Sequence, residues 1–194
     1  PFQPRSSSGN HSATPSGAGL SASRPPFSLE EDSAPQGRRR GIIIHKLLEL
    51  MSPPDPRPNP KIEDFLAYGI NQDQLATWQP EAVGVLRAKE LRFLFDPAHY
   101  LTAYNEIPIA YTTNDNQLIY GIIDRVVLLE NAVWIIDYKT QTGIGESALP
   151  EFIRYYEPQL NYYAEGARKL WPGRSIHTAL LLTSNARLLP VPTF

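Results

Sequence analysis

The stretch 121-GIIDRVVLLENAVWIIDYKT-140 places two aspartates and a lysine within two largely apolar runs. Both runs are rich in β-branched residues and are separated at Asn131, which predicts two strands joined by a tight turn. Burying a charged group in such a run is expensive unless something pairs with it. The positions of Asp124, Asp137 and Lys139 therefore call for a chemical explanation.

The alternation of side chains along a strand indicates which of these groups meet. Asp137 and Lys139 share one face of their strand, and Tyr138 takes the other. Asp124 lies across the turn and can reach the same edge of the sheet. Converging carboxylates repel, and Mg²⁺ bound by oxygen ligands removes the repulsion and activates a bound water. With Lys139 supplying positive charge to a phosphate, the stretch has the parts for hydrolysing a phosphodiester, although Asp-X-Lys alone is usually an exposed ion pair.

The segments on either side of this stretch complete an α/β pattern. Strands are predicted for segments rich in β-branched and aromatic residues: 103–112, 117–130, 132–140, 176–183 and 187–191. Helices are predicted where apolar residues recur at helical spacing: 41–51, 62–94 in two or three pieces, and about 150–170. Pro80 suits the first turn of the last piece before residue 94. We therefore expect an α/β fold with a central mixed sheet flanked by helices, whose first three strands form an antiparallel meander.

The overall composition excludes several classes of protein. With 194 residues and 42% hydrophobic content, the chain can form one domain with a substantial core. A net charge of −2 attracts neither nucleic acid nor acidic membranes, so a polyanion must be met by a local patch or a bound metal. The absence of cysteine excludes disulfides, thiolate metal sites and iron–sulfur clusters. No apolar run has the length of a membrane span, so no membrane partner is expected.

The first part of the chain differs in composition from the rest. Residues 1–40 are rich in Ser, Gly, Pro and Ala, which predicts a flexible linker or tail ahead of a domain at 41–194. Arg38–Arg40 at its end are interpreted as a solvated charge cluster rather than a phosphate contact. The sequence begins at Pro1 without an initiator methionine, and we expect it to be a fragment of a longer protein.

Ordered motifs along the chain resemble the RecB-like branch of the PD-(D/E)XK nucleases. They are 41-GIIIH-45, 106-EIPI-109, 121-GIIDR-125, 133-VWIIDYKT-140 and 155-YYEPQLNYYA-164. The closing stretch 171-WPGRSIHTALLLT-183 looks most like the C-terminal nuclease domain of AddA-type helicase–nuclease subunits. The resemblance covers roughly residues 38–191. It implies the restriction-endonuclease-like core of this superfamily, and Gln141 is a departure because the family often has Gly or Asp there.

The resemblance also implies roles for individual residues. It assigns the metal ligands as His45, Asp124, Asp137, the backbone carbonyl of Tyr138 and, as an accessory acid, Glu106. It assigns the catalytic set as Lys139, Asp137, Asp124, Gln159 and Tyr163. Gln159 and Tyr163 are four residues apart on a predicted helix and therefore share one of its faces.

Each of these residues also has an ordinary structural interpretation. A lone histidine on an apolar helix, such as His45, is more often structural than a ligand, and Glu106 could be an exposed charge on an edge strand. Gln159 could be solvated while Tyr163 is part of the core. Glu49, one helical turn beyond His45, is expected to face solvent rather than to bond the imidazole.

The resemblance implies a Mg²⁺-dependent deoxyribonuclease, with Mn²⁺ able to substitute. It would be the exonuclease domain of a bacterial, cytoplasmic helicase–nuclease that repairs double-strand breaks, cutting single DNA strands beside an AddB-like partner protein. The chain has no G-x-x-x-x-G-K-[ST] loop, so an ATPase motor would lie outside it. The alternatives are an inactive DNA-binding or scaffolding module, which the intact set of predicted site residues argues against, and a phage or CRISPR-associated RecB-like nuclease.

Overall fold

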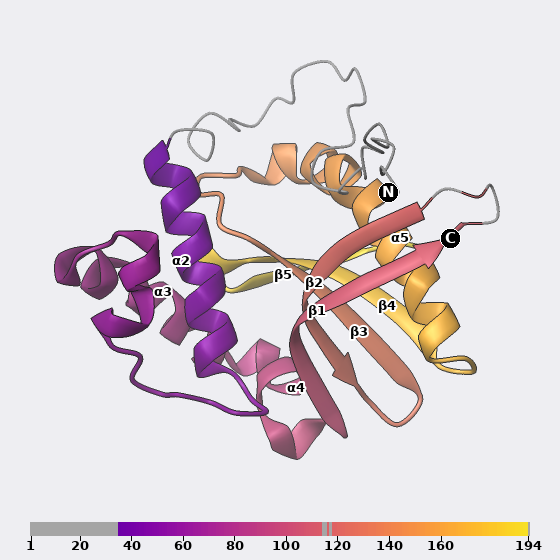
Figure 1. Ribbon diagram of the computed structural model, residues 1–194. Coiled ribbons are helices and arrows are strands. Elements are labelled where there is room, and N and C mark those ends of the chain that lie inside the picture. The colour runs from indigo at the N-terminus through magenta and orange to yellow at the C-terminus, as the bar shows by residue number, and fades with distance from the viewer. Residues whose placement is uncertain (1–34, 114–115, 117, 194) are drawn as a thin grey trace, which may run out of the picture.

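The computed structural model describes residues 35–113, 116 and 118–193, and within them one sheet forms the centre of the fold (Figure 1). Its strands run in the order β1-β2-β3-β4-β5. Their bounds are Thr102–Thr112, Leu118–Leu128, Ala132–Lys139, Ser175–Leu182 and Arg187–Val191. β3 and β4 are parallel and the other neighbours are antiparallel. The predicted mixed sheet and the antiparallel meander of β1 to β3 are confirmed.

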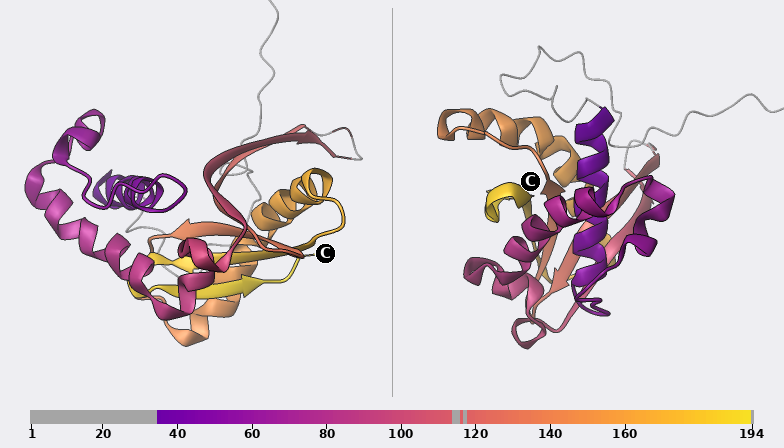
Figure 2. Two further views of the ribbon diagram at one scale, coloured as in Figure 1. Left: turned by 90° about the horizontal axis from the view of Figure 1, so that it is seen from below. Right: turned by 90° about the vertical axis from the view of Figure 1, so that its left-hand side faces the viewer.

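Helices cover both faces of the sheet (Figures 1 and 2). The α-helices are α2 (Pro35–Met51), α3 (Gln72–Arg87), α4 (Arg92–Phe95) and α5 (Leu149–Leu170). Short 3₁₀ segments are η2 (Ile62–Tyr68), η3 (Lys89–Leu91), η4 (Pro97–His99), η5 (Glu146–Ala148) and η6 (Thr183–Asn185). The crossover between parallel strands β3 and β4 is made by α5, because such strands cannot be joined by a tight turn.

The core is divided by the sheet into two clusters, and β3 contributes to both by strict alternation. Ile136 and Tyr138 belong to a first cluster with residues of α2, α3 and α4. Val133 and Ile135 belong to a second cluster with residues of α5. Asp137 and Lys139 have the parity of the second cluster, so their side chains project toward α5.

Two helix boundaries differ from the sequence prediction. α2 begins at Pro35 rather than at Gly41, because proline is well suited to the first turn of a helix. The predicted tail at 1–34 lies outside the described residues. Pro80 lies inside α3 rather than in a first turn, and the N-cap of that helix is Asn71, whose side chain accepts from the backbone N–H of Gln74.

The β1–β2 hairpin changes the core cluster on which it packs partway along its length. Ala103 and Val127 contact the first cluster, whereas Ile109 and Ile123 contact the second, although all four have the same parity. The cross-strand register has no inserted residue. The change instead coincides with Glu106, whose φ of 51° departs from strand geometry. The hairpin therefore curves out of the main sheet, as the left view of Figure 2 shows.

A buried arginine joins the helical layer to the sheet just beside this bend. Arg125 is fully buried, and its Nε donates to the carbonyl oxygen of Leu94 at 2.8 Å. Its Nη1 donates to the Asn105 Oδ1 at 2.6 Å, the Pro53 carbonyl at 3.0 Å and the Ser52 Oγ at 3.1 Å. Among the described residues it has no carboxylate within ion-pair distance, so neutral acceptors stabilise its charge.

We expect Arg125→Met to lower the free energy of unfolding by about 3 kcal/mol, because buried acceptors left unpaired cost about 1–3 kcal/mol each. Urea unfolding followed by circular dichroism measures the change. Arg87→Met is the matched control, since Arg87 is exposed on α3, and it should stay within about 0.5 kcal/mol of the wild type. Equal stability of the Arg125→Met protein and the wild type would show that this network does not hold the layers together.

Candidate active site

Three acidic residues form one row across β1, β2 and β3. The β1–β2 register places Glu106 opposite Asp124. The β2–β3 ladder pairs Arg125 with Ile136, so the next position along both strands brings Asp124 opposite Asp137. Backbone pairing between β2 and β3 stops at this row, beyond which β2 pairs with β1 alone. The row therefore lies at the point where the sheet opens.

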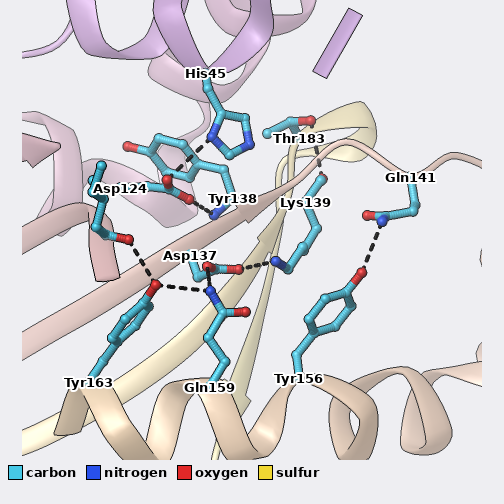
Figure 3. Close-up of polar contacts among 11 residues, drawn as sticks. His45, Asp124, Asp137, Tyr138, Lys139, Gln141, Tyr156, Gln159, Tyr163 and Thr183 are labelled. Atoms are coloured by element: carbon cyan, nitrogen blue, oxygen red, sulfur yellow. Dashed lines mark hydrogen bonds and ion pairs between the residues drawn. The ribbon is translucent and has the colours of Figure 1, made fainter. Parts of the chain in front are cut away.

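The Asp124 carboxylate fills the place of a strand partner at this opening (Figure 3). Its Oδ2 accepts the backbone N–H of Tyr138 at 2.6 Å, and its Oδ1 lies 3.3 Å from the Nδ1 of His45 on α2. Burial raises the pKa of Asp124, but the neighbouring His45 and the Tyr138 N–H outweigh it and hold the pKa below its usual value. Burial lowers the pKa of His45, but Asp124 outweighs it and raises that pKa.

Glu106 joins His45 and Asp124 in a compact group of possible metal ligands. One ligand atom from each of the three lies within 4.8 Å of the others. Burial and the nearby Asp124 carboxylate raise the pKa of Glu106 to about 7. Carboxylate oxygens with one imidazole nitrogen suit Mg²⁺ or Mn²⁺, and a cation relieves the repulsion between the acids. The donor set therefore fits the predicted divalent metal.

Asp137 takes part in a second set of contacts rather than in this compact group. Its Oδ1 accepts from Gln159 Nε2 at 3.0 Å, and its Oδ2 lies 2.5 Å from Lys139 Nζ. That Oδ2 is buried and receives no well-directed hydrogen bond from the described residues. Burial raises the pKa of Asp137, with a further contribution from Asp124. Its predicted role as a metal ligand, like that of the Tyr138 carbonyl, stays a prediction.

The Lys139 ammonium lies between an acid and an aromatic ring. Its Nζ is 3.9 Å from the centroid of Tyr156 on α5, in addition to its contact with Asp137. The Tyr156 hydroxyl in turn accepts from Gln141 Nε2 at 3.1 Å. Burial lowers the pKa of Lys139, but Asp137 outweighs it and raises that pKa. The lysine is thus a held, charged group beside the acidic row.

The helix residues predicted for the site do face it. Gln159 Nε2 donates to Asp137 and also to the Tyr163 Oη at 3.0 Å. The Tyr163 hydroxyl donates to the carbonyl oxygen of Ile122 at 2.9 Å. This chain of hydrogen bonds fixes α5 to β2 and β3. All side chains predicted for the site border one pocket of about 290 Å³, whose remaining wall is formed by residues 120–122.

A network that the sequence did not reveal holds the end of β3. Arg40 Nη1 donates to the Thr140 carbonyl oxygen at 2.7 Å, and Arg40 Nη2 pairs with Glu81 of α3. Thr183 Oγ1 lies 2.6 Å from Glu81 Oε1 and 3.3 Å from the carbonyl oxygen of Lys139. The interpretation of Arg38–Arg40 as solvated is therefore wrong for Arg40, which helps to position the strand that carries the lysine.

Glu49, expected from the sequence to face solvent, has a partner that is not the imidazole. Its carboxylate accepts from Lys46 Nζ at 2.8 and 2.9 Å. The predicted absence of a bond to His45 agrees with this arrangement, and the contact with Lys46 leaves Asp124 as the carboxylate that orients the histidine.

The fold and the site together define an α/β protein with acidic residues, an imidazole and a lysine gathered where a mixed sheet opens. The family model of the PD-(D/E)XK nuclease superfamily matches residues 17–188. The chain belongs to this superfamily.

Curated relatives give a more particular similarity, since all three described here are the AddA-type subunits of ATP-dependent helicase/nucleases. The relative from Enterococcus faecalis is 25% identical over 88% of this chain and 15% of its own length. The relative from Lachnoclostridium phytofermentans is 23% identical over 75% of this chain and 14% of its own length. That of Lacticaseibacillus paracasei is 28% identical over 81% and 14%. The chain thus spans only 14–15% of the length of these relatives.

A solved structure of the protein VC1899 from Vibrio cholerae covers 79% of this chain and 43% of its own, at 13% identity and a TM-score of 0.32. At this score the likeness carries no argument about the present chain. Among the residues that the structure describes, no helix combines the length and the apolar character needed to cross a membrane.

We expect Mn²⁺ or Mg²⁺ to raise the melting temperature of the wild type, because an ion that binds only the folded state stabilises it by about 2.7 kcal/mol at one hundred times its Kd. The increase on adding metal should be lost in Asp124→Ala and reduced in His45→Ala. His99→Ala is the matched control, since His99 lies on η4 beside Asp96 and outside the ligand group. Scanning calorimetry with and without metal makes the comparison, and an undiminished increase in Asp124→Ala would count against the site.

Proposed function

We propose that this chain is a Mg²⁺-dependent deoxyribonuclease domain that hydrolyses phosphodiesters with a metal-activated water, and that Mn²⁺ can replace Mg²⁺. The observation that carries the proposal is the row Glu106–Asp124–Asp137 across three strands, with His45 on one side and Lys139 on the other. Membership of the nuclease superfamily supports the same chemistry.

The residues of the chain divide this chemistry between them. His45, Glu106 and Asp124 would hold the cation, and Asp137 would complete the acidic side of the pocket. When bound, a divalent cation makes its water more acidic and offsets charge on phosphate oxygens. Lys139 presents an ammonium toward the same pocket, where it can contact the scissile phosphate or orient water.

The residues on α5 keep these groups in place. Gln159 holds the Asp137 carboxylate, and Tyr163 ties Gln159 to the carbonyl of Ile122. Neither contact requires the cation. Preorganised hydrogen bonds of this kind limit the reorganisation needed when charge develops in the transition state.

The biological setting is proposed from the relatives. Because they are named as subunits of ATP-dependent helicase/nucleases, we propose that this chain is the exonuclease domain of such a protein. It would act in the bacterial cytoplasm on single strands supplied by a helicase motor outside this chain, with an AddB-like partner protein, in recombinational repair of double-strand breaks.

Two other functions are compatible with the same fold. An inactive DNA-binding or scaffolding module would not need His45, Asp124, Asp137 and Lys139 to border one pocket, and here all four do. A phage or CRISPR-associated nuclease would use the same chemistry, but the relatives named above are helicase/nuclease subunits. The observations favour the first proposal over both.

We expect Asp137→Asn and Lys139→Met each to lower the cleavage rate of a labelled single-stranded oligonucleotide in Mg²⁺ by about a thousandfold, the scale on which a charge-stabilising group acts. Asp73→Asn, on the exposed first turn of α3, is the control and should cut at the wild-type rate. Circular dichroism confirms folding. A folded Asp137→Asn protein that cuts at full rate contradicts the proposal.

The ring of Tyr156 should matter more than its hydroxyl, because the ammonium of Lys139 lies over the ring face. A cation–π contact in a desolvated site is worth about 1–2 kcal/mol. We therefore expect Tyr156→Leu to lower kcat about tenfold with little change in KM, and Tyr156→Phe to keep most of the activity. Steady-state kinetics at saturating Mg²⁺ distinguish the two, and equal losses in both variants would exclude this role of the ring.

A further inference from the structure

The curved half of the β1–β2 hairpin exposes an apolar face beside the pocket. On β2, Leu118, Tyr120 and Ile122 retain 60%, 42% and 44% of their exposure. Their register partners on β1 lie on the same face and are also exposed: Thr112, Ala110 and Pro108. Residues 107–112 and 118–123 contain no charged side chain. We refer to these six exposed residues as the hairpin face.

The opposite side of the hairpin is already occupied by the protein. A Cβ added at Gly166 of α5 would lie 2.3 Å from Ile109 Cδ1 and 3.0 Å from Tyr111 Cδ1, so strand and helix are in close contact. The Tyr111 hydroxyl also donates to the carbonyl oxygen of Tyr162 at 2.8 Å. These contacts fix the hairpin on α5, so the exposure of Tyr120 and Ile122 belongs to a packed, positioned surface.

The hairpin face runs directly into the candidate active site. Residues 120–122 form one wall of the pocket that also contains Asp124, Asp137 and Lys139. Tyr163 fixes this wall through its hydrogen bond to the Ile122 carbonyl oxygen. A polymer whose backbone entered the pocket would therefore pass its neighbouring units over Tyr120 and Ile122.

We propose that the hairpin face is a binding subsite for unpaired nucleobases, with one base stacked on Tyr120 and its neighbour against Ile122. The proposal rests on the nuclease function proposed above and specifies its substrate. Phosphates are not suited to this face, which carries no cation, whereas an aromatic ring next to an aliphatic side chain suits the flat apolar faces of bases. A duplex keeps those base faces stacked inside, so the subsite selects single strands.

The test measures binding to the full chain in a cleavage-deficient Asp137→Asn background, by fluorescence anisotropy with a labelled single strand and a matched duplex. Because stacking is worth about 1–3 kcal/mol per base, we expect Tyr120→Ala to weaken single-strand binding about tenfold. Tyr120→Phe should bind as the parent protein does, and duplex binding should not change. Tyr104→Ala, on the exposed Tyr104 of β1 beyond the acidic row, is the matched control and should have no effect.

A second measurement separates stacking from other losses. Single strands with one abasic position, moved stepwise along the oligonucleotide, should bind the parent protein less tightly at one register. The Tyr120→Ala variant should not discriminate between them. Unchanged single-strand affinity in Tyr120→Ala, or equal loss for single strand and duplex, would overturn the subsite.

Failure of the subsite can be told apart from failure of the nuclease proposal. If the chain with native Asp137 cuts DNA with Mg²⁺ while Tyr120→Ala binds single strands normally, only the subsite is lost. If that chain cuts nothing, the proposed function itself has failed. Self-association in sedimentation experiments that Tyr120→Ala abolishes would assign the hairpin face to a second copy and would also overturn the subsite.

Discussion

The hydrogen bond from the Tyr138 backbone N–H to the Asp124 carboxylate completes the sheet at the point where β2 separates from β3. A side chain here takes the place of a strand partner. A buried carboxylate is stable only when donors or cations satisfy it, and His45 on α2 provides the second contact. The opening of the sheet, the orientation of the imidazole and the negative charge of the pocket therefore depend on the same group.

The neighbouring residue couples this opening to the rest of the fold. Asp124 and Arg125 point to opposite faces of β2, so the acid faces the pocket while the arginine reaches the helical layer. Arg125 also binds Asn105, which directly precedes the left-handed Glu106. The bend of the hairpin and the position of its acid are thus held from both sides. A change in the packing of α2 or α4 would move the ligand group with it.

The parts of the site that follow from local rules could be predicted from the sequence. A tight turn near Asn131 brings Asp124 opposite Asp137, and helical spacing puts Gln159 and Tyr163 on one face of α5. The pairing of Arg40 with Glu81 could not be predicted, because it joins two helices through tertiary packing. Nor could the reversal of the hairpin, because alternation assumes a flat strand and gives no sign of a residue such as Glu106 with positive φ.

The electrostatics of the pocket explain why an uncharged surface beside it is useful. Glu106, Asp124 and Asp137 outnumber the nearby Lys139 and His45, and the chain as a whole has a net charge of −2. A DNA backbone is therefore repelled from the site unless cations compensate the acids, and attraction through phosphates alone weakens as salt rises. Contacts to bases do not carry this repulsion, because stacking acts on neutral rings. Apolar contacts on the curved hairpin can hold a strand near the acids without adding positive charge that would compete with the metal.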